Sequence, residues 1–167
     1  TTAGPYSHAE GYSTSAYIKA HSEGSATTAG GWYSHAEGIA TTAGGYQSHA
    51  EGSLCSAVYS SSHAEGSQTQ AYGAYSHSGG RLSKTHLLAQ WARASGGHSN
   101  QLGSAQTTIT HLFGRTTNAT ATELTLDGSS SPFVLSDGQT ISCLINIVGR
   151  KENDTGAPNH CSFLRQA

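Results

Sequence analysis

The chain has 167 residues, of which 11% are charged and 35% are hydrophobic, and its formal net charge is −2 at pH 7. Soluble globular domains usually contain about a quarter charged residues and nearly half apolar residues, so an ordinary single-core domain is not expected. The chain lacks the basic excess that captures nucleic acid, and no apolar run reaches the length of a membrane span. We therefore expect no nucleic-acid partner and no membrane insertion.

The two halves of the chain differ in composition. Residues 1–80 contain 13 of the 21 glycines and all eight tyrosines, but only four Val, Ile or Leu residues. The longer β-branched runs lie in residues 81–167. Because four large aliphatic side chains do not supply a core for 80 residues, we expect the first half to gain order from repetition and from contacts with other chains.

A short repeat organises residues 1–80. The pentapeptide Ser-His-Ala-Glu-Gly, with two variants, occupies residues 7–11, 20–24, 34–38, 48–52, 62–66 and 76–80. Its histidines are spaced by 13 residues once and by 14 residues thereafter, at His8, His21, His35, His49, His63 and His77. Helical-pair repeats need roughly 30 residues or more, so this period excludes them. The sequence therefore predicts a β-solenoid in which each coil has two short strands and two turns.

The pattern Ser-His-Ala-Glu-Gly-x-x-Thr-x-Ala-x-Gly resembles the head repeat of YadA-like trimeric adhesins. Its His-Ala-Glu form is similar to repeats in tail-fibre and other structural proteins of phages and some large viruses. The resemblance covers residues 1–80 and continues more weakly to about residue 106. It implies an all-β fold, with a left-handed parallel β-roll of 14-residue repeats that is trimeric, followed by a small antiparallel β-rich module.

His and Glu of the repeat are expected to form ladders on one face of the roll, because strand positions i and i+2 share a face and neighbouring strands lie about 4.8 Å apart. The expected ladder comprises His8, Glu10, His21, Glu23, His35, Glu37, His49, Glu51, His63 and Glu65. We interpret it as structural pairing without metal or cofactor, which predicts raised His pKa values and lowered Glu pKa values. The alternative is a metal site built from three chains, with the candidate ligands His8, His35, His49 and His63.

Aromatic residues recur near the Ser-His step of the repeat. They are interpreted as packing between coils or chains, or as a platform for a receptor glycan, at Tyr33, Tyr46, Tyr59 and Tyr75. One coil encloses little more than Ala, Ser and Gly, so its own core offsets little of the entropy lost on folding. We therefore expect an obligate parallel homotrimer, with the tyrosines, Trp32 and Ile39 at the contacts between chains.

Residues 81–106 are expected to form a connector that caps the roll. The repeat decays there, and Trp91 takes the next histidine position. Residues 87–94 are expected to be a single helical turn or a last distorted coil. Because an uncovered solenoid edge pairs with other strands, Leu87, Leu88 and Trp91 are the residues that would supply the bulk of a cap.

Residues 107–167 predict a β-sandwich-like module that is incomplete, so the chain is expected to be a segment of a longer polypeptide. Strands are expected at 107–113, 122–126, 133–135, 139–148 and 160–164, with a turn at Asp127-Gly128. Cys143 and Cys161 lie on consecutive strands and form either a thiol pair or a disulfide, whereas Cys55 is expected to be free.

The sequence contains no nucleophile elbow, P-loop or zinc motif, so we expect no enzymatic activity. The resemblance implies a structural and adhesive segment of a trimeric phage or viral tail fibre that attaches to a host, located in the virion or outside the cell. Its partners would be copies of itself, other virion or fibre subunits, and a host receptor or glycan. One alternative is the head of a bacterial trimeric autotransporter adhesin. Another is part of a fibre-borne depolymerase or self-cleaving fibre protein with its active site outside this segment.

Overall fold

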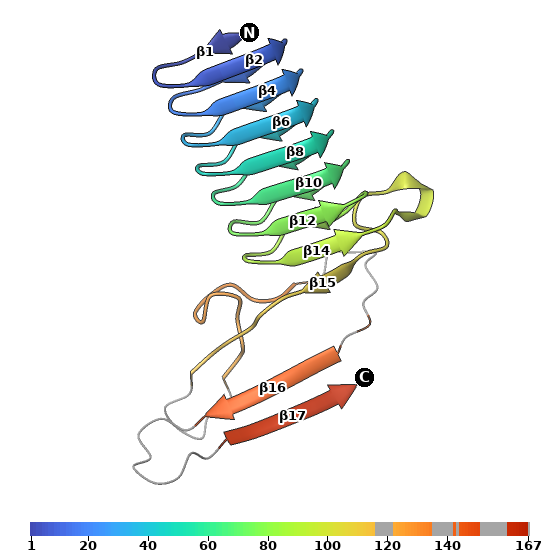
Figure 1. Ribbon diagram of the computed structural model, residues 1–167. Coiled ribbons are helices and arrows are strands. Elements are labelled where there is room, and N and C mark those ends of the chain that lie inside the picture. Colours follow the sequence, from blue (N-terminus) through green and yellow to red (C-terminus); the bar gives the residue numbers. More distant parts are fainter. Residues whose placement is uncertain (116–121, 135–141, 143, 151–159, 167) are drawn as a thin grey trace. The chain divides into compact units, whose positions relative to one another are not determined.

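The computed structural model describes residues 1–115, 122–134, 142, 144–150 and 160–166 (Figure 1). They divide into two compact units, residues 1–133 and residues 134–167. The described residues contain strands and one 3-10 turn at His98–Asn100, and no α-helix. The expected all-β class is confirmed, with a parallel β-solenoid of 14-residue coils and an antiparallel pair of strands.

Two sheets form the solenoid, and each coil adds one strand to each sheet (Figure 1). The seven-stranded sheet consists of β1 (Thr2–Ala3), β3 (Ser15–Ala16), β5 (Thr28–Ala29), β7 (Thr42–Ala43), β9 (Ser56–Ala57), β11 (Gln70–Ala71) and β13 (Lys84–Thr85). The eight-stranded sheet consists of β2 (His8–Tyr12), β4 (His21–Ser25), β6 (His35–Ile39), β8 (His49–Ser53), β10 (His63–Ser67), β12 (His77–Gly80), β14 (Trp91–Ala94) and β15 (Thr107–Ile109).

The register of the strands places equivalent repeat residues side by side. In β6 and β8, for example, His35 pairs with His49 and Glu37 pairs with Glu51. The early 13-residue spacing has a local origin in the turn that leads into the eight-stranded sheet. Four residues connect β3 to β4, whereas five connect β7 to β8. A one-residue change in this turn therefore leaves the strand register intact.

Small side chains make up most of the solenoid interior, and Gln90 takes a buried serine position in the last coil. Fully buried alanines of this interior are Ala29, Ala36, Ala43, Ala50, Ala57, Ala64 and Ala71. Side chains alternate at the short turn between the sheets, where Thr27 is fully buried and Thr28 is exposed. In the longer turn, Ser34 and Ser48 are buried, and each hydroxyl donates a hydrogen bond to a carbonyl three residues earlier, at 2.7 and 2.8 Å. The core is thus narrow and partly polar.

The glycine of the pentapeptide is required by backbone geometry. Gly38 has φ = 103°, a conformation that L side chains rarely adopt. A Cβ at this position would also overlap the carbonyl oxygen of Gly52 in the next coil. The same conformation recurs at Gly24, Gly52 and Gly66. The close approach of successive coils therefore explains why the pentapeptide ends in glycine.

The solenoid extends past residue 80, where the sequence predicted its end. β13 and β14 form one more coil in register, with Trp91 opposite His77, so the single helical turn expected as one option at residues 87–94 is wrong. The sequence of this coil departs from the repeat, because Lys84, Thr85 and Trp91 replace the usual residues while keeping the spacing.

The cap lies after this last coil. β15 pairs antiparallel with β14 and so covers the edge of the eight-stranded sheet. At the edge of the other sheet, the Gln106 side chain replaces a strand. Its Oε1 accepts a hydrogen bond from the Lys84 N–H and its Nε2 donates one to the Lys84 carbonyl, both at 2.8 Å. Backbone groups that would otherwise pair with other strands are thereby satisfied.

Residues 107–133 belong to the first unit and do not form the expected sandwich sheet within the described part of the chain. Phe113 and Thr125 form an isolated antiparallel bridge. The expected turn at Asp127-Gly128 is present, and the Asp127 carboxylate accepts hydrogen bonds from the N–H groups of Ser129 and Ser131 at 2.9 and 3.0 Å. These bonds hold the pKa of the Asp127 carboxyl well below its usual value.

The second unit contains an antiparallel pair, β16 (Leu144–Arg150) and β17 (His160–Gln166). Its register places Cys161 opposite Gly149. Cys143 lies outside the described residues, as does the Cys161 side chain, so the question of a Cys143–Cys161 bond falls there too. Cys55, by contrast, is a free and buried thiol.

Candidate functional site

The repeat histidines form one continuous stack along the eight-stranded sheet. Consecutive rings of the four central residues His21, His35, His49 and His63 are nearly parallel, with centroids 4.7 Å apart and interplanar angles of 3°, 9° and 4°. The residue after each of these four histidines is buried, whereas the histidine and the glutamate that follows are partly exposed. Strand alternation thus places both ladders on the outer face of this sheet.

The stack is longer than the ladder predicted from the sequence. His77 packs edge-on against His63, with centroids 4.9 Å apart, and the Trp91 ring continues the stack at 5.8 Å from His77. His77 keeps the 14-residue spacing, which was the signal available in the sequence. The glutamate of its pentapeptide is replaced by Gly79, which masked its place in the ladder.

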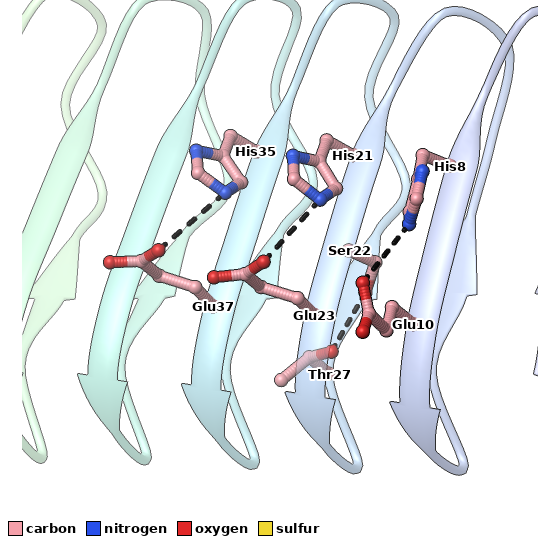
Figure 2. Close-up of polar contacts among 8 residues, drawn as sticks. All are labelled: His8, Glu10, His21, Ser22, Glu23, Thr27, His35 and Glu37. Atoms are coloured by element: carbon pink, nitrogen blue, oxygen red, sulfur yellow. Dashed lines mark hydrogen bonds and ion pairs between the residues drawn. The ribbon is translucent and has the colours of Figure 1, made fainter.

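Histidines and glutamates pair in two different registers. In the first coils each histidine Nε2 lies near the glutamate of its own strand, at 3.4 Å for His8–Glu10, 3.6 Å for His21–Glu23 and 3.7 Å for His35–Glu37 (Figure 2). In the later coils each histidine is near the glutamate of the preceding coil, at 3.4 Å for both His63–Glu51 and His77–Glu65.

His49 stands where the register changes. Its own glutamate, Glu51, pairs with His63, and the preceding one, Glu37, pairs with His35. Within the described residues, the buried Nε2 atoms of His35, His49 and His63 have no hydrogen-bond partner. His35 and His63 still lie within ion-pair distance of a glutamate, so among the described residues the shielded Nε2 of His49 is the one with neither kind of partner.

Burial lowers the pKa of His35 and of His49, and the neighbouring imidazoles lower both further. The nearby glutamates act in the opposite direction, but they are outweighed. The expectation that pairing raises the pKa of the ladder histidines is therefore wrong for these two residues. Desolvation dominates because the stacked rings shield one another. Neutral imidazoles at the centre leave the glutamate charges largely uncompensated.

The glutamates line an open groove beside the histidine stack. Its walls are formed by four glutamates, four pentapeptide glycines and one arginine, namely Glu23, Glu37, Glu51, Glu65, Gly38, Gly52, Gly66, Gly80 and Arg93. Three triads of residues could each hold a metal ion in this region, because the ligand atoms within each triad lie within 4.8 Å of one another. They are Glu23–His35–Glu37, Glu37–His49–Glu51 and Glu51–His63–Glu65. Of the four histidines predicted as metal candidates, His35, His49 and His63 belong to these triads and His8 does not.

The predicted aromatic residues lie in the longer turns, at one edge of the coils. The exposed fractions are 46% for Tyr33, 49% for Tyr46, 53% for Tyr59 and 65% for Tyr75. Tyr33 and Tyr46 meet edge-on with centroids 5.8 Å apart. Tyr33 and Tyr75 occupy the same position within their turns, whereas Tyr46 and Tyr59 each occupy another, so the four form an exposed aromatic surface and not a single-file ladder.

Comparison with known proteins found no matching family model, no similar curated protein and no similar solved structure. Within the described residues, no helix has the length and apolar character needed to cross a membrane.

Proposed function

We propose that this chain is a structural and adhesive segment of a trimeric phage or viral tail fibre that contacts the host. The observation that carries the proposal is the combination of a solenoid core of small residues with exposed aromatic turns. Trp32, Tyr33 and Tyr46 are each between 46% and 49% exposed in the single chain. Such a surface on a repetitive scaffold suits contacts with further copies of the chain.

The energetics of one coil support association. Ordering the backbone opposes folding by about 1–2 kcal/mol per residue, and each hydrogen bond between coils returns about 0.5–1.5 kcal/mol. Buried alanines add little apolar area, because Ala43, Ala50 and their equivalents carry a single methyl group. Burial of Trp32, Tyr33 and Tyr46 between chains would supply the missing apolar contribution.

Sedimentation equilibrium of the full chain tests the trimer. We expect a trimer mass at micromolar concentration, and Tyr46→Ser is expected to weaken it. Leu54→Ser is the matched control, since Leu54 is 53% exposed but lies in the short turn at the other edge of the coil. A folded monomer at micromolar concentration would overturn the proposed assembly.

Immunogold labelling tests the location. Antibodies against the repeat should label fibres on purified virus or phage particles from the source of the sequence. Labelling confined to the surface of bacterial cells would instead favour the autotransporter adhesin.

The proposed role requires no turnover of a substrate. The purified chain should leave surface polysaccharides intact in a reducing-end assay. Cleavage that a single substitution abolishes would replace this proposal with the depolymerase alternative.

A further inference from the structure

We infer that the central part of the ladder binds divalent transition-metal ions of the Zn²⁺ class, each held by one imidazole nitrogen and two carboxylates of a single chain. The sites are the three triads that centre on His35, His49 and His63. This differs from a ring of histidines contributed by three chains, and it stands whether or not the chain is a trimer.

The distances within the ladder fit ligands that share an ion. Zn²⁺ binds nitrogen and oxygen at about 2.0–2.2 Å in tetrahedral geometry, which sets its ligand atoms about 3.4 Å apart. Nε2 of His63 lies 3.4 Å from Oε1 of Glu51, and Nε2 of His35 lies 3.7 Å from Oε2 of Glu37. Good N–H···O hydrogen bonds are shorter, at about 2.7–3.2 Å. The pairs are thus spaced more like ligands of one ion than like hydrogen-bond partners.

The unsatisfied imidazole nitrogens provide the second observation. Nε2 of His35, His49 and His63 is buried and has no hydrogen-bond partner among the described residues. In Figure 2 the Nε2 atom of His35 points to the carboxylate of Glu37. Among the described residues His49 has no ion-pair partner either, whereas His35 and His63 each face one carboxylate, at 3.7 and 3.4 Å. A cation between them would accept the lone pair of the nitrogen while being held by the carboxylates.

The negative charge of the groove also favours a bound cation. Glu23, Glu37, Glu51 and Glu65 follow one another in register along the groove, and the cation among the residues that line it is Arg93. Mixed imidazole and carboxylate ligands suit Zn²⁺, Ni²⁺ and Cu²⁺. Ca²⁺ and Mg²⁺ prefer shells made only of oxygen, so they should compete poorly.

Shared glutamates limit the occupancy. Glu37 belongs to the first and second triads, and Glu51 belongs to the second and third. The first and third triads have no residue in common, so both can be filled together. We therefore expect two ions per chain.

The test is a Zn²⁺ titration of the full chain after chelator treatment and dialysis, in competition with a chromophoric chelator. We expect saturable binding of two ions per chain and a higher Tm at saturation. The variant Glu37→Gln/Glu51→Gln removes a carboxylate from all three triads and should weaken binding by more than about 100-fold. Glu10→Gln is the matched control, because Glu10 lies in the same ladder but outside the triads. Circular dichroism should show that both variants are folded.

Three results would overturn the inference. They are the absence of saturable Zn²⁺ binding, equal binding by the double variant and the Glu10→Gln control, and displacement of Zn²⁺ by equimolar Mg²⁺. X-ray absorption of the zinc-loaded wild-type chain gives a second measurement that does not depend on folding of a variant. It should show nitrogen and oxygen neighbours with one imidazole per zinc, whereas a shell of sulfur or of oxygen alone would contradict the assignment.

Discussion

Oγ of Ser22 and Oγ1 of Thr27 lie 2.7 Å apart inside the solenoid, where both side chains are fully buried (Figure 2). A matching pair joins Ser78 and Ser83 at 2.6 Å. In coils where alanine takes the first of these positions, the threonine hydroxyl has no partner among the described residues, as at Thr14, Thr41 and Thr69. A serine in this column therefore decides whether the buried hydroxyl across the core is satisfied.

This relationship predicts that Ala36→Ser stabilises the protein. The new hydroxyl would face Thr41 as Ser22 faces Thr27, and a satisfied buried hydroxyl is worth about 1 kcal/mol. Chemical denaturation at fixed protein concentration should show an increase of this order in the free energy of unfolding.

Ala50→Ser is the matched control for this change. Ala50 stands in the coil of Cys55, whose thiol already donates to the carbonyls of Ser53 and Gly66 at 3.5 and 3.3 Å. The new serine would lack a matching threonine, so we expect lower stability. Equal losses in both variants would contradict the pairing rule.

A second prediction concerns the glycine at which successive coils meet. Gly38→Ala places a Cβ against the carbonyl oxygen of Gly52 and also imposes a strained φ. Holding a residue in such a backbone region lowers the stability of the fold by about 1–3 kcal/mol, and the steric overlap lowers it further. The free energy of unfolding should therefore fall by at least about 2 kcal/mol. Ala40→Gly is the reverse control: Ala40 has φ = 52°, so glycine there should be neutral or stabilising, and a similar loss in both variants would contradict the explanation.

Sequence reasoning predicted the architecture because periodicity is a local property. The 14-residue spacing of His35, His49 and His63 predicted a coil with two strands and two turns, and strand alternation placed the alanines inside. For residues 87–94 the sequence did not distinguish a last coil from a helical turn, because Thr85 and Trp91 preserve the period without preserving the residue types. Spacing carried more information here than identity.

The electrostatics of the ladder were harder to predict. The sequence shows that His35 and Glu37 share a face, and pairing alone would raise the histidine pKa. It does not show that the rings stack at 4.7 Å and exclude water from one another, so that the histidine pKa is lowered and not raised. The change of pairing register at His49 is also invisible, since all the pentapeptides there are identical. Both depend on how neighbouring coils pack.

The lowered histidine pKa values predict how the stability of the chain in EDTA depends on pH. His35 and His49 have a lowered pKa in the folded state, because of burial and then of the neighbouring imidazoles. The unfolded chain, with histidine pKa values near about 6.5, therefore binds more protons than the folded one as the pH falls through that value. Stability is fully present above about pH 6.5 and declines on acidification.

Thermal unfolding between pH 8 and pH 5 measures this effect. The Tm should fall toward pH 5, and His98→Gln should leave the profile unchanged because His98 lies outside the stack and is exposed. A Tm that rises between pH 8 and pH 6 would show that folding raises the histidine pKa values, as the pairing hypothesis requires.

The last prediction concerns the edge of the seven-stranded sheet, which one side chain covers. Gln106→Ala removes both hydrogen bonds to the Lys84 backbone and leaves its N–H and carbonyl without these partners. Loss of partners for partly buried polar groups should lower the free energy of unfolding by about 1–3 kcal/mol. Gln106→Glu should be at least as harmful, because a carboxylate can still accept from the Lys84 N–H but cannot donate to its carbonyl.

Gln101→Ala is the control for the Gln106 variants, since Gln101 is exposed in the same segment. An uncovered strand edge also pairs with other chains, so light scattering should show faster aggregation of the Gln106 variants than of the control. If both variants match the control in stability and in aggregation rate, β15 and the backbone around it cap the solenoid without help from Gln106.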